Sequence, residues 1–566
     1  MSLFGSIQLA GNALRAADIG LQVVGNNIAN ANTPGYARQE AQLVPAPTQR
    51  LGNLLLGLGV KVAGIVQKTD ENLSERLRNA SSDAASSETL KSSYQQLEGL
   101  LGELGENDLS TSLNNFFSSI NDVLNQPESV SVRNLAVLKG RTLAGDISRL
   151  ANRIRQIRSD TNDQVEDAAT NINRLISSVR NLNIKIAASE GGEIAKSDAA
   201  GLRVQRSNDL AALAKLIDIK VNEQPSGGVA VITPAGDSLV FEGNLLTVKA
   251  VNFSDRGQTI SEIRIQDTDS PLAATSGVVG GLITARDEIL GGFLDKLDTF
   301  TRTLAFEFNK LHSSGQGLNG YPTLTSEFSI SDTTAPLDDA GLSFAPGNGS
   351  FEVLVYNKRT KLTETTRISV DLNGLDTDTS LADLRAQLDA VDGISASISA
   401  DSRLTLRSDS ADQSIAFAND TSGALAALGI NTFFLGSTAL DIGVSALVVA
   451  DPSLFATSQG GIGADTENGV ALAGFLDRAL DSHSGATLAD LYSQLTGEVT
   501  QSSAAAQSVY EGLKVFEDSL NGQVQATTGV NLDEEAIKML AFQRMYQASA
   551  KFIATVNDLL GVLIDL

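Results

Sequence analysis

Residues 531–566 read NLDEEAIKMLAFQRMYQASAKFIATVNDLLGVLIDL, and apolar side chains recur along them at alternating steps of three and four. This spacing predicts a helix whose a and d positions form a heptad seam for a partner helix. We name this set the C-terminal seam: Met539, Phe542, Tyr546, Ser549, Ile553, Val556, Leu560 and Leu563. A second stripe lies beside it at every seventh residue: Met545, Phe552, Leu559 and Leu566. Because so wide an apolar face exceeds what one helix covers, we expect several neighbours to bury it.

The other end of the chain repeats this pattern. Residues 2–29 carry an N-terminal seam of Leu3, Ile7, Ala10, Leu14, Ala17, Leu21, Val24 and Ile28. The run Asn30–Gly35 should end this helix, because Pro34 cannot continue it and disfavours helical geometry at Thr33. Two amphipathic helices on an ordinary globular core would give the same periodicity. Two unbroken seams at opposite ends of the chain favour instead a coiled coil between the termini.

Composition excludes several classes of function. The chain has 566 residues, enough for three or four domains. Its 42 Lys and Arg against 67 Asp and Glu give a formal charge of −25, which disfavours nucleic acid and anionic membranes as partners. With no Cys and two His, we expect neither disulfides nor a Cys/His metal site. No apolar run is long enough for membrane insertion, and the N-terminus lacks a secretory signal, so any export would use a route without a cleaved signal.

No catalytic constellation emerges from the sequence. Asp481, Ser482 and His483 supply the residue types of a triad, but immediate sequence neighbours cannot adopt triad geometry. His312 closes a predicted helix, where a partial positive charge is favoured for electrostatic reasons alone. We therefore expect no catalytic residues, no cofactor and no metal, and we do not expect an enzyme.

Between the ends, the periodicity alternates between helical and extended. Short strands are expected at 57–62 and 65–66, at five places within 218–268, and in two hairpins within 350–407 that flank a short helix at 380–390. Helices are expected at about 85–125, 130–190, 280–312 and 487–525, and Asn531 with Glu534 can form a capping box for the last helix. The β-β-α-β-β pattern of 350–407 could form a small independent domain.

These elements predict an α+β multidomain fold. Terminal helices would form a coiled coil, long helices a middle bundle, and β-rich insertions would lie at the distal end. The expected terminal domain comprises residues 1–35 and 530–566. A long-helix domain with a short β part would comprise 36–217, 270–318 and 465–529, and the β-rich outer part 218–269 and 319–464.

Both terminal segments resemble one bacterial family. The run Asn26–Tyr36, NNIANANTPGY, is similar to the N-terminal signature of flagellar rod, hook and hook-associated proteins, and includes the turn residues Asn30, Thr33, Pro34, Gly35 and Tyr36. Gly529–Glu535 and Phe542–Ala550 resemble the family's C-terminal signature. The helical middle, with Gly280–Asp287 and Phe308–Gly315, is similar to the hook-associated members at the junction of hook and filament.

This resemblance implies a structural subunit of the extracellular flagellum, required for filament assembly and motility, and exported by the flagellar type III system. It implies a ring of about eleven subunits that joins the hook protein to the second junction protein (FlgL) and the filament. An export chaperone (FlgN) would bind the C-terminal helix, whose two stripes would aggregate if left bare. Another axial protein (hook protein or FlgL) and a secreted adhesin remain as alternatives.

Overall fold

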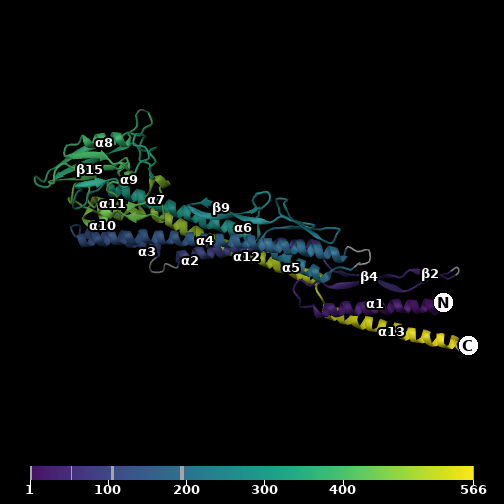
Figure 1. The fold of residues 1–566 in the computed structure, drawn as a ribbon. Coiled ribbons are helices and arrows are strands. Elements are labelled where there is room, and N and C mark those ends of the chain that lie inside the picture. The colour runs from purple at the N-terminus through teal and green to yellow at the C-terminus, as the bar shows by residue number, and fades with distance from the viewer. Residues whose placement is uncertain (1–2, 52–53, 103–107, 191–196, 376, 565–566) are drawn as a thin grey trace. The chain divides into compact units, whose positions relative to one another are not determined.

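The computed structural model describes residues 3–51, 54–102, 108–190, 197–375 and 377–564. The fold is α+β, as predicted from the sequence. Its contacts divide the chain into two compact units (Figure 1). Unit 1 comprises Met1–Ser93, Ser159–Arg286 and Ala505–Leu566, and unit 2 comprises Tyr94–Arg158 and Asp287–Ala504.

The helices and strands have the following bounds. The helices are α1 (Leu3–Ala29), α2 (Glu71–Gly102), α3 (Leu109–Asn125), α4 (Val130–Glu190), α5 (Ala200–Leu216), α6 (Gly277–Thr284), the π-helix η2 (Ala285–Leu290), α7 (Gly291–Ser313), α8 (Leu381–Asp389), α9 (Ala424–Leu428), α10 (Ala446–Ala450), α11 (Glu467–Ala473), α12 (Leu488–Thr528) and α13 (Leu532–Ile564). The strands are β1 (Gln39–Pro45), β2 (Thr48–Leu51), β3 (Leu54–Gly57), β4 (Val60–Gln67), β5 (Lys220–Glu223), β6 (Val229–Ile232), β7 (Ser238–Phe241), β8 (Asn244–Leu245), β9 (Val248–Asp255), β10 (Gln258–Ile265), β11 (Thr323–Thr325), β12 (Gly349–Asn357), β13 (Thr363–Val370), β14 (Ile394–Ile398), β15 (Leu404–Ser408), β16 (Gln413–Ala418), β17 (Phe434–Leu435) and β18 (Gly443–Val444).

The two ends of the chain meet in unit 1. Helices α1 and α13 lie side by side, with both termini at the same end of the pair (Figure 1). A two-stranded antiparallel ribbon of β1 and β4 packs on α1, and its register shifts once between Gln42 and Leu43. The β2–β3 hairpin extends this ribbon. The predicted pairing of the terminal helices is therefore confirmed.

The remainder of unit 1 is a helical layer covered by small sheets. Strands β5–β8 form one antiparallel sheet, and β9 pairs with β10. Their inward side chains share one hydrophobic core with α4, α5 and α6, in which Ile172, Val179, Leu213 and Val231 are fully buried. These strands thus pack directly on helices, as the Val- and Ile-rich sequence of β6 and β10 requires. The three-domain division made from the sequence stays a prediction.

Unit 2 combines helices with two three-stranded antiparallel sheets. The strand orders are β13-β12-β16 and β11-β15-β14. An aromatic cluster of buried rings joins α3, α7 and the segment around β17, with Phe116 and Phe433 stacked at 5.4 Å between ring centroids. Each sheet needs a strand from outside 350–407, namely β11 or β16. The expectation that 350–407 forms a β-β-α-β-β domain by itself was therefore wrong, because its two hairpins belong to different sheets.

The predicted helices largely agree with the observed ones. α4 has the predicted bounds, Val130–Glu190, and its heptad residues Leu143, Ile147 and Ile154 are fully buried. The predicted helix at 85–125 is two helices, α2 and α3. The helix predicted at 280–312 contains a π-helical turn, η2. Helix α5 and strands β1, β2 and β16 were missed. Within the described ranges, no helix combines the length and apolarity needed to cross a bilayer.

Candidate assembly site at the paired termini

The smaller residues of the N-terminal seam are the ones that are buried where α1 contacts α13 and the β1–β4 ribbon. Ala10, Ala17 and Val24 are buried, whereas Ile7, Leu14, Leu21 and Ile28 keep part of their surface exposed. Leu3 lies in the helix, but its side chain falls outside the described set. The most buried line on α1 also includes Ala16, Gly20, Val23 and Asn27. The larger seam side chains therefore retain surface that a further partner could cover.

Close approach of the two helices depends on Gly20. A Cβ atom at this position would lie 2.5 Å from Cε1 of Phe542 on α13, well inside van der Waals contact. Phe542 belongs to the predicted C-terminal seam. The Phe542 ring thus fits against the α1 backbone at Gly20, whereas a Cβ at Gly11 or Gly25 of the same helix would have nothing within 4 Å.

The C-terminal seam divides into a covered and an open part. Val556 and Ser549 are buried, and Met539, Phe542, Ile553 and Leu560 are half-buried. Tyr546 is 39% exposed. In the second stripe Phe552 is 43% and Leu559 53% exposed, while Met545 is half-buried. The side chain of Leu563 and the whole of Leu566 lie outside the described part of the chain.

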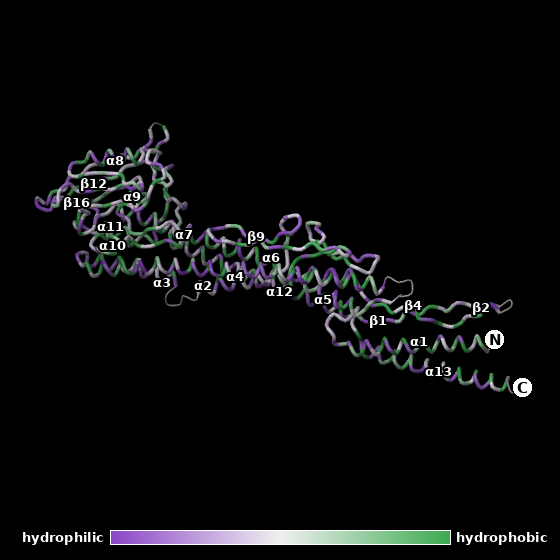
Figure 2. Tube along the Cα trace, in the orientation of Figure 1, coloured by the Kyte–Doolittle hydropathy of each residue, from purple (hydrophilic) through white to green (hydrophobic). Residues whose placement is uncertain are grey.

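Further apolar side chains continue the open face of α13. Ile537, Leu540 and Val562 are each more than half exposed. Figure 2 shows hydrophobic and hydrophilic residues alternating along α1 and α13, as expected for amphipathic helices. One helix partner and one β-ribbon leave a large part of the apolar surface of α13 open to solvent.

A buried cluster of polar side chains connects the start of α13 to the end of α1 through hydrogen bonds. The Asn27 amide donates to Oε2 of Glu535 at 2.9 Å and to the Gln39 carbonyl at 2.9 Å. Its oxygen accepts hydrogen bonds from the Gln39 N–H and from the Tyr36 hydroxyl. Asn27 and Glu535 are fully buried. Burial, reinforced by the negative charge of Glu535, raises the pKa of Tyr36.

Arg38 supplies the charge that balances the cluster. Its Nε lies 2.9 Å from Oε1 of Glu535, and its Nη1 donates to Oε2 of Glu534 at 2.8 Å. The Arg38 N–H also donates to the carbonyl of Thr528 at the end of α12. Because an unpaired buried carboxylate is strongly unfavourable, Arg38 permits Glu535 to be buried, together with Lys538, whose Nζ lies 3.5 Å from the same Glu535 oxygen. Residues about 500 positions apart in sequence are joined in this way.

Only half of the predicted capping box is present. The Asn531 side chain accepts from the N–H of Asp533 at 3.0 Å and of Glu534 at 3.3 Å, which caps α13. The Glu534 carboxylate binds Arg38 instead of returning to the Asn531 N–H. The tertiary ion pair thus replaces the local bond that the sequence suggested.

The Asn30–Tyr36 turn has the geometry its residues predict. The Asn30 carbonyl accepts from the Thr33 N–H, and the Thr33 carbonyl accepts from the Tyr36 N–H. Gly35 has a φ of +73°, and a Cβ there would lie 2.0 Å from Oδ1 of Asn208. Glycine is required at this position for both reasons. The turn thereby rests against α5.

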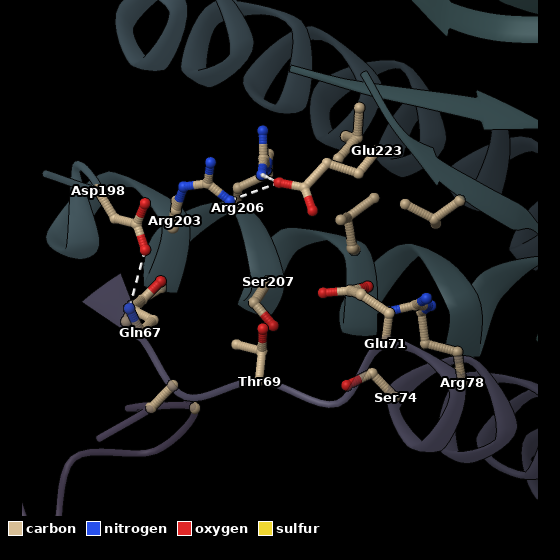
Figure 3. A pocket seen from close by; sticks show the side chains of 16 residues that line it. Gln67, Thr69, Glu71, Ser74, Arg78, Asp198, Arg203, Arg206, Ser207 and Glu223 are labelled. Atoms are coloured by element: carbon tan, nitrogen blue, oxygen red, sulfur yellow. Dashed lines mark hydrogen bonds and ion pairs between the residues drawn. The ribbon is translucent and has the colours of Figure 1, made fainter. Parts of the chain in front are cut away.

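A polar pocket of about 100 Å³ lies beside this turn (Figure 3). Gln67 and Thr69 after β4, Ser74 and Arg78 of α2, and Arg206 of α5 contribute to its lining. Arg203 donates to both carboxylate oxygens of Glu190, at 2.9 and 2.8 Å, and to Glu223.

Carboxylates in and around this pocket lie near its guanidinium groups. Burial works against the charged form of Glu190, but the bonds from Arg203 and from the Ala199 N–H outweigh it and lower the pKa of this carboxyl. Burial lowers the pKa of Arg78, and Glu71 and Glu75 partly oppose that shift. Guanidinium–carboxylate pairs of this kind hold elements together, and no nucleophile is paired with a base among the described lining residues.

Sequence reasoning found this candidate site only in part. It singled out both seams and the turn, but it did not find Asn27, Arg38 or Glu535 as one cluster. Asn27 lies in the signature run Asn26–Tyr36, and Glu535 lies in the run Gly529–Glu535. Their place in these runs was the one sequence signal that could have pointed to them. His483, set aside as a catalytic residue, lies with Nε2 3.2 Å from the Thr303 hydroxyl.

Comparisons with known proteins agree with this geometry. Residues 94–326 match the family described as flagellar hook-associated protein FlgK helical domain. Residues 7–36 match flagella basal body rod protein, and residues 523–566 match the C-terminal region of flagellar basal body rod FlgEFG proteins. Flagellar hook-associated protein 1 of Salmonella typhimurium is 23% identical over 579 aligned positions, covering 99% of both chains. Along its whole length, the chain is therefore similar to flagellar hook-associated protein 1.

Two further proteins named flagellar hook-associated protein 1 match as well. The Escherichia coli protein is 23% identical over 99% of both chains, and that of Bacillus subtilis is 26% identical over 56% of this chain and 69% of its own length. The solved structure of the flagellar hook junction protein FlgK from Burkholderia pseudomallei is 14% identical, covers 80% of this chain and all of that chain, and has a TM-score of 0.49. The sequence matches support a structural role in the flagellar axis.

Proposed function

We propose that this chain forms the ring that joins the flagellar hook to the filament and is required for filament assembly and motility. The observation that carries the proposal is the full-length similarity to hook-associated protein 1 of two bacteria, together with a terminal helix pair whose apolar surface is only partly covered. In a ring of about eleven copies, neighbouring terminal helices would cover the remaining surface. The role is structural, without catalysis.

The two seams are the proposed contact surfaces within that ring. The half-buried N-terminal residues Leu14 and Leu21 and the exposed second stripe with Phe552 and Leu559 would pack against other copies, the hook protein and the second junction protein. Before export through the flagellar type III system, the open face of α13 would be covered by the export chaperone FlgN. Open apolar faces of this width would otherwise lead to aggregation.

Location in the flagellum tests this proposal most simply. A strain expressing the chain with an epitope tag inserted in the exposed loop at Lys358–Lys361 would be examined by immunogold electron microscopy. We expect label confined to the boundary between hook and filament. Label along the whole hook would favour the alternative of a hook protein, and label spread over the cell or filament surface would favour an adhesin.

A further inference from the structure

One stretch of this acidic protein is strongly basic. Residues 130–158, the part of α4 in unit 2, contain seven Lys or Arg and a single acidic residue, Asp146. Asp146 is buried, where its carboxylate accepts from the Ser112 hydroxyl and pairs with Arg149. Among the other charges, Arg133 and Arg158 are also buried. Every charge that α4 exposes along these residues is therefore positive.

The exposed charges lie on one face of the helix. Arg141, Arg149 and Arg153 are exposed, and they follow one another at helical spacings of eight and four residues. Arg141 and Arg153 take part in none of the ion pairs found among the described residues. On the same face, one and two turns toward the N-terminus, Leu138 is 52% and Leu135 40% exposed. This set, the basic face of α4, combines two apolar side chains with guanidinium groups, a composition favoured in protein interfaces.

The same unit carries a surface of opposite character. Helices α2, α7 and α12 border a groove of about 120 Å³, whose apolar lining residues Leu97 and Phe293 are themselves buried. Exposed carboxylates line or flank it at Glu288, Asp295 and Glu498. Glu498 is partly balanced by Lys296. We call this set the acidic groove, and the property that it offers to a partner is its negative charge.

We propose that the basic face of α4 in one copy docks on the acidic groove of a second copy, in a head-to-tail contact. The inference rests on the proposed function, since it supplies a contact between neighbouring copies of the ring. A contact between two different faces of one chain is heterologous, and repeated heterologous contacts give a ring when the rotation between copies closes. Charge complementarity selects a copy of this chain, because the guanidinium groups of Arg141 and Arg153 would find acidic counterparts at the groove.

The absence of cysteine from the chain gives a clean test in assembled flagella. Leu138→Cys and Glu288→Cys would be made singly and together, and intact flagella treated with a short bis-maleimide. Co-expression of the two single variants should give cross-linked dimers, and the double variant should add trimers and longer species. Each single variant alone should stay monomeric, because a head-to-tail contact never brings two copies of one residue together.

Outcomes of this test separate the inference from the proposed function. Flagella that contain the variants but yield no cross-linked chain would overturn the inference and leave the junction role standing. Dimers from Leu138→Cys alone would also overturn it, since they require a symmetric contact. If the unmodified chain were absent from isolated flagella, the proposed function itself would fail.

Charge-reversal variants give a second, independent test of the proposed contact. Arg141→Glu with Arg153→Glu should lower incorporation into flagella at least about tenfold, because the contact loses its complementarity. Lys358→Glu with Arg359→Glu changes the net charge equally on a distant exposed loop and should leave incorporation unchanged. Adding Glu288→Arg and Asp295→Arg to the α4 variant reverses both faces and should restore incorporation. Equal loss in the control pair, or no rescue in a folded four-site variant, would contradict the inference.

Discussion

Glu535 and Glu534 are sequence neighbours that both pair with Arg38 yet lie in opposite environments. The Glu535 side chain is fully buried, whereas that of Glu534 is 56% exposed. A buried carboxylate depends on its partner, while an exposed ion pair contributes little to stability. Matched substitutions at Glu535 and Glu534 therefore distinguish the effect of burying a carboxylate from the effect of its charge alone.

We predict that Glu535→Gln weakens the attachment of α13 and that Glu534→Gln does not. Removing the buried charge leaves Arg38 without its 2.9 Å partner and should cost about 3 kcal/mol. The matched change at Glu534 should cost less than about 1 kcal/mol. Amide hydrogen exchange in the first turns of α13 measures the effect of each variant. Equal protection of these amides in the two variants would show that the buried Glu535 does not hold α13 to α1.

His312 in unit 2 gives the protein a pH-dependent stability. Its Nε2 accepts from the Ala456 N–H at 3.2 Å, and its Nδ1 donates to the Asn431 carbonyl at 2.9 Å, so the ring is neutral. Burial, with a smaller effect of Arg133, lowers the pKa of His312 from 6.5 to about 4. Between these values the unfolded chain binds more protons than the folded one, so stability falls as the pH falls from 6.5 toward 4.

The predicted loss approaches ~3 kcal/mol at pH 4 relative to pH 7. Calorimetric unfolding of the full chain between these pH values measures it. His312→Gln should remove this part of the pH dependence, although it will lower stability at pH 7. An unaltered pH dependence in His312→Gln would contradict the assignment.

At the scale of elements, helix periodicity was the most informative property of the sequence. It predicted α1 and α4 because their apolar residues recur every three or four positions and a Pro or Gly turn marks at least one end. Strand pairing was harder, because β16 and β11 complete sheets begun far away in sequence. The fully buried Asn27–Glu535 pair spans 508 residues, and no local pattern connects its members.

The distance between α1 and α13 should depend on Gly20. Gly20→Val would place a side chain 2.5 Å from the Phe542 ring and should destabilise the helix pair by about 1–3 kcal/mol. Gly25→Val is the matched control, because nothing lies within 4 Å of a Cβ there. Limited proteolysis of α13 reports the difference, and equal protease sensitivity of the two variants would show that the close approach is unimportant.

The two stripes of α13 should have separable functions. Ile553 is half-buried and Phe552 is 43% exposed. Ile553→Asp should release α13 from α1, since a charge is placed in the seam. Phe552→Asp should preserve the pair in the monomer and still prevent assembly into flagella. Circular dichroism of the monomer with a motility assay distinguishes these cases, and normal motility with Phe552→Asp would refute the role of the second stripe.

At the scale of the whole molecule, the sequence predicted an α+β chain with meeting ends but not its two compact units. Unit 2 depends on Phe116, Phe308 and Phe433, which come from three distant segments and meet in one aromatic cluster. Aromatic residues carry no periodic signal of their partners. The signature runs at both termini, in contrast, are sufficient to suggest the flagellar family from the sequence alone.

The central claim is that this chain connects the hook to the filament. Electron microscopy of cells lacking the gene, with and without complementation by the intact chain, tests it most directly. We predict hooks without filaments and flagellin released into the medium, with filaments restored on complementation. Filaments of normal length and number on the hooks of the uncomplemented strain would contradict the claim.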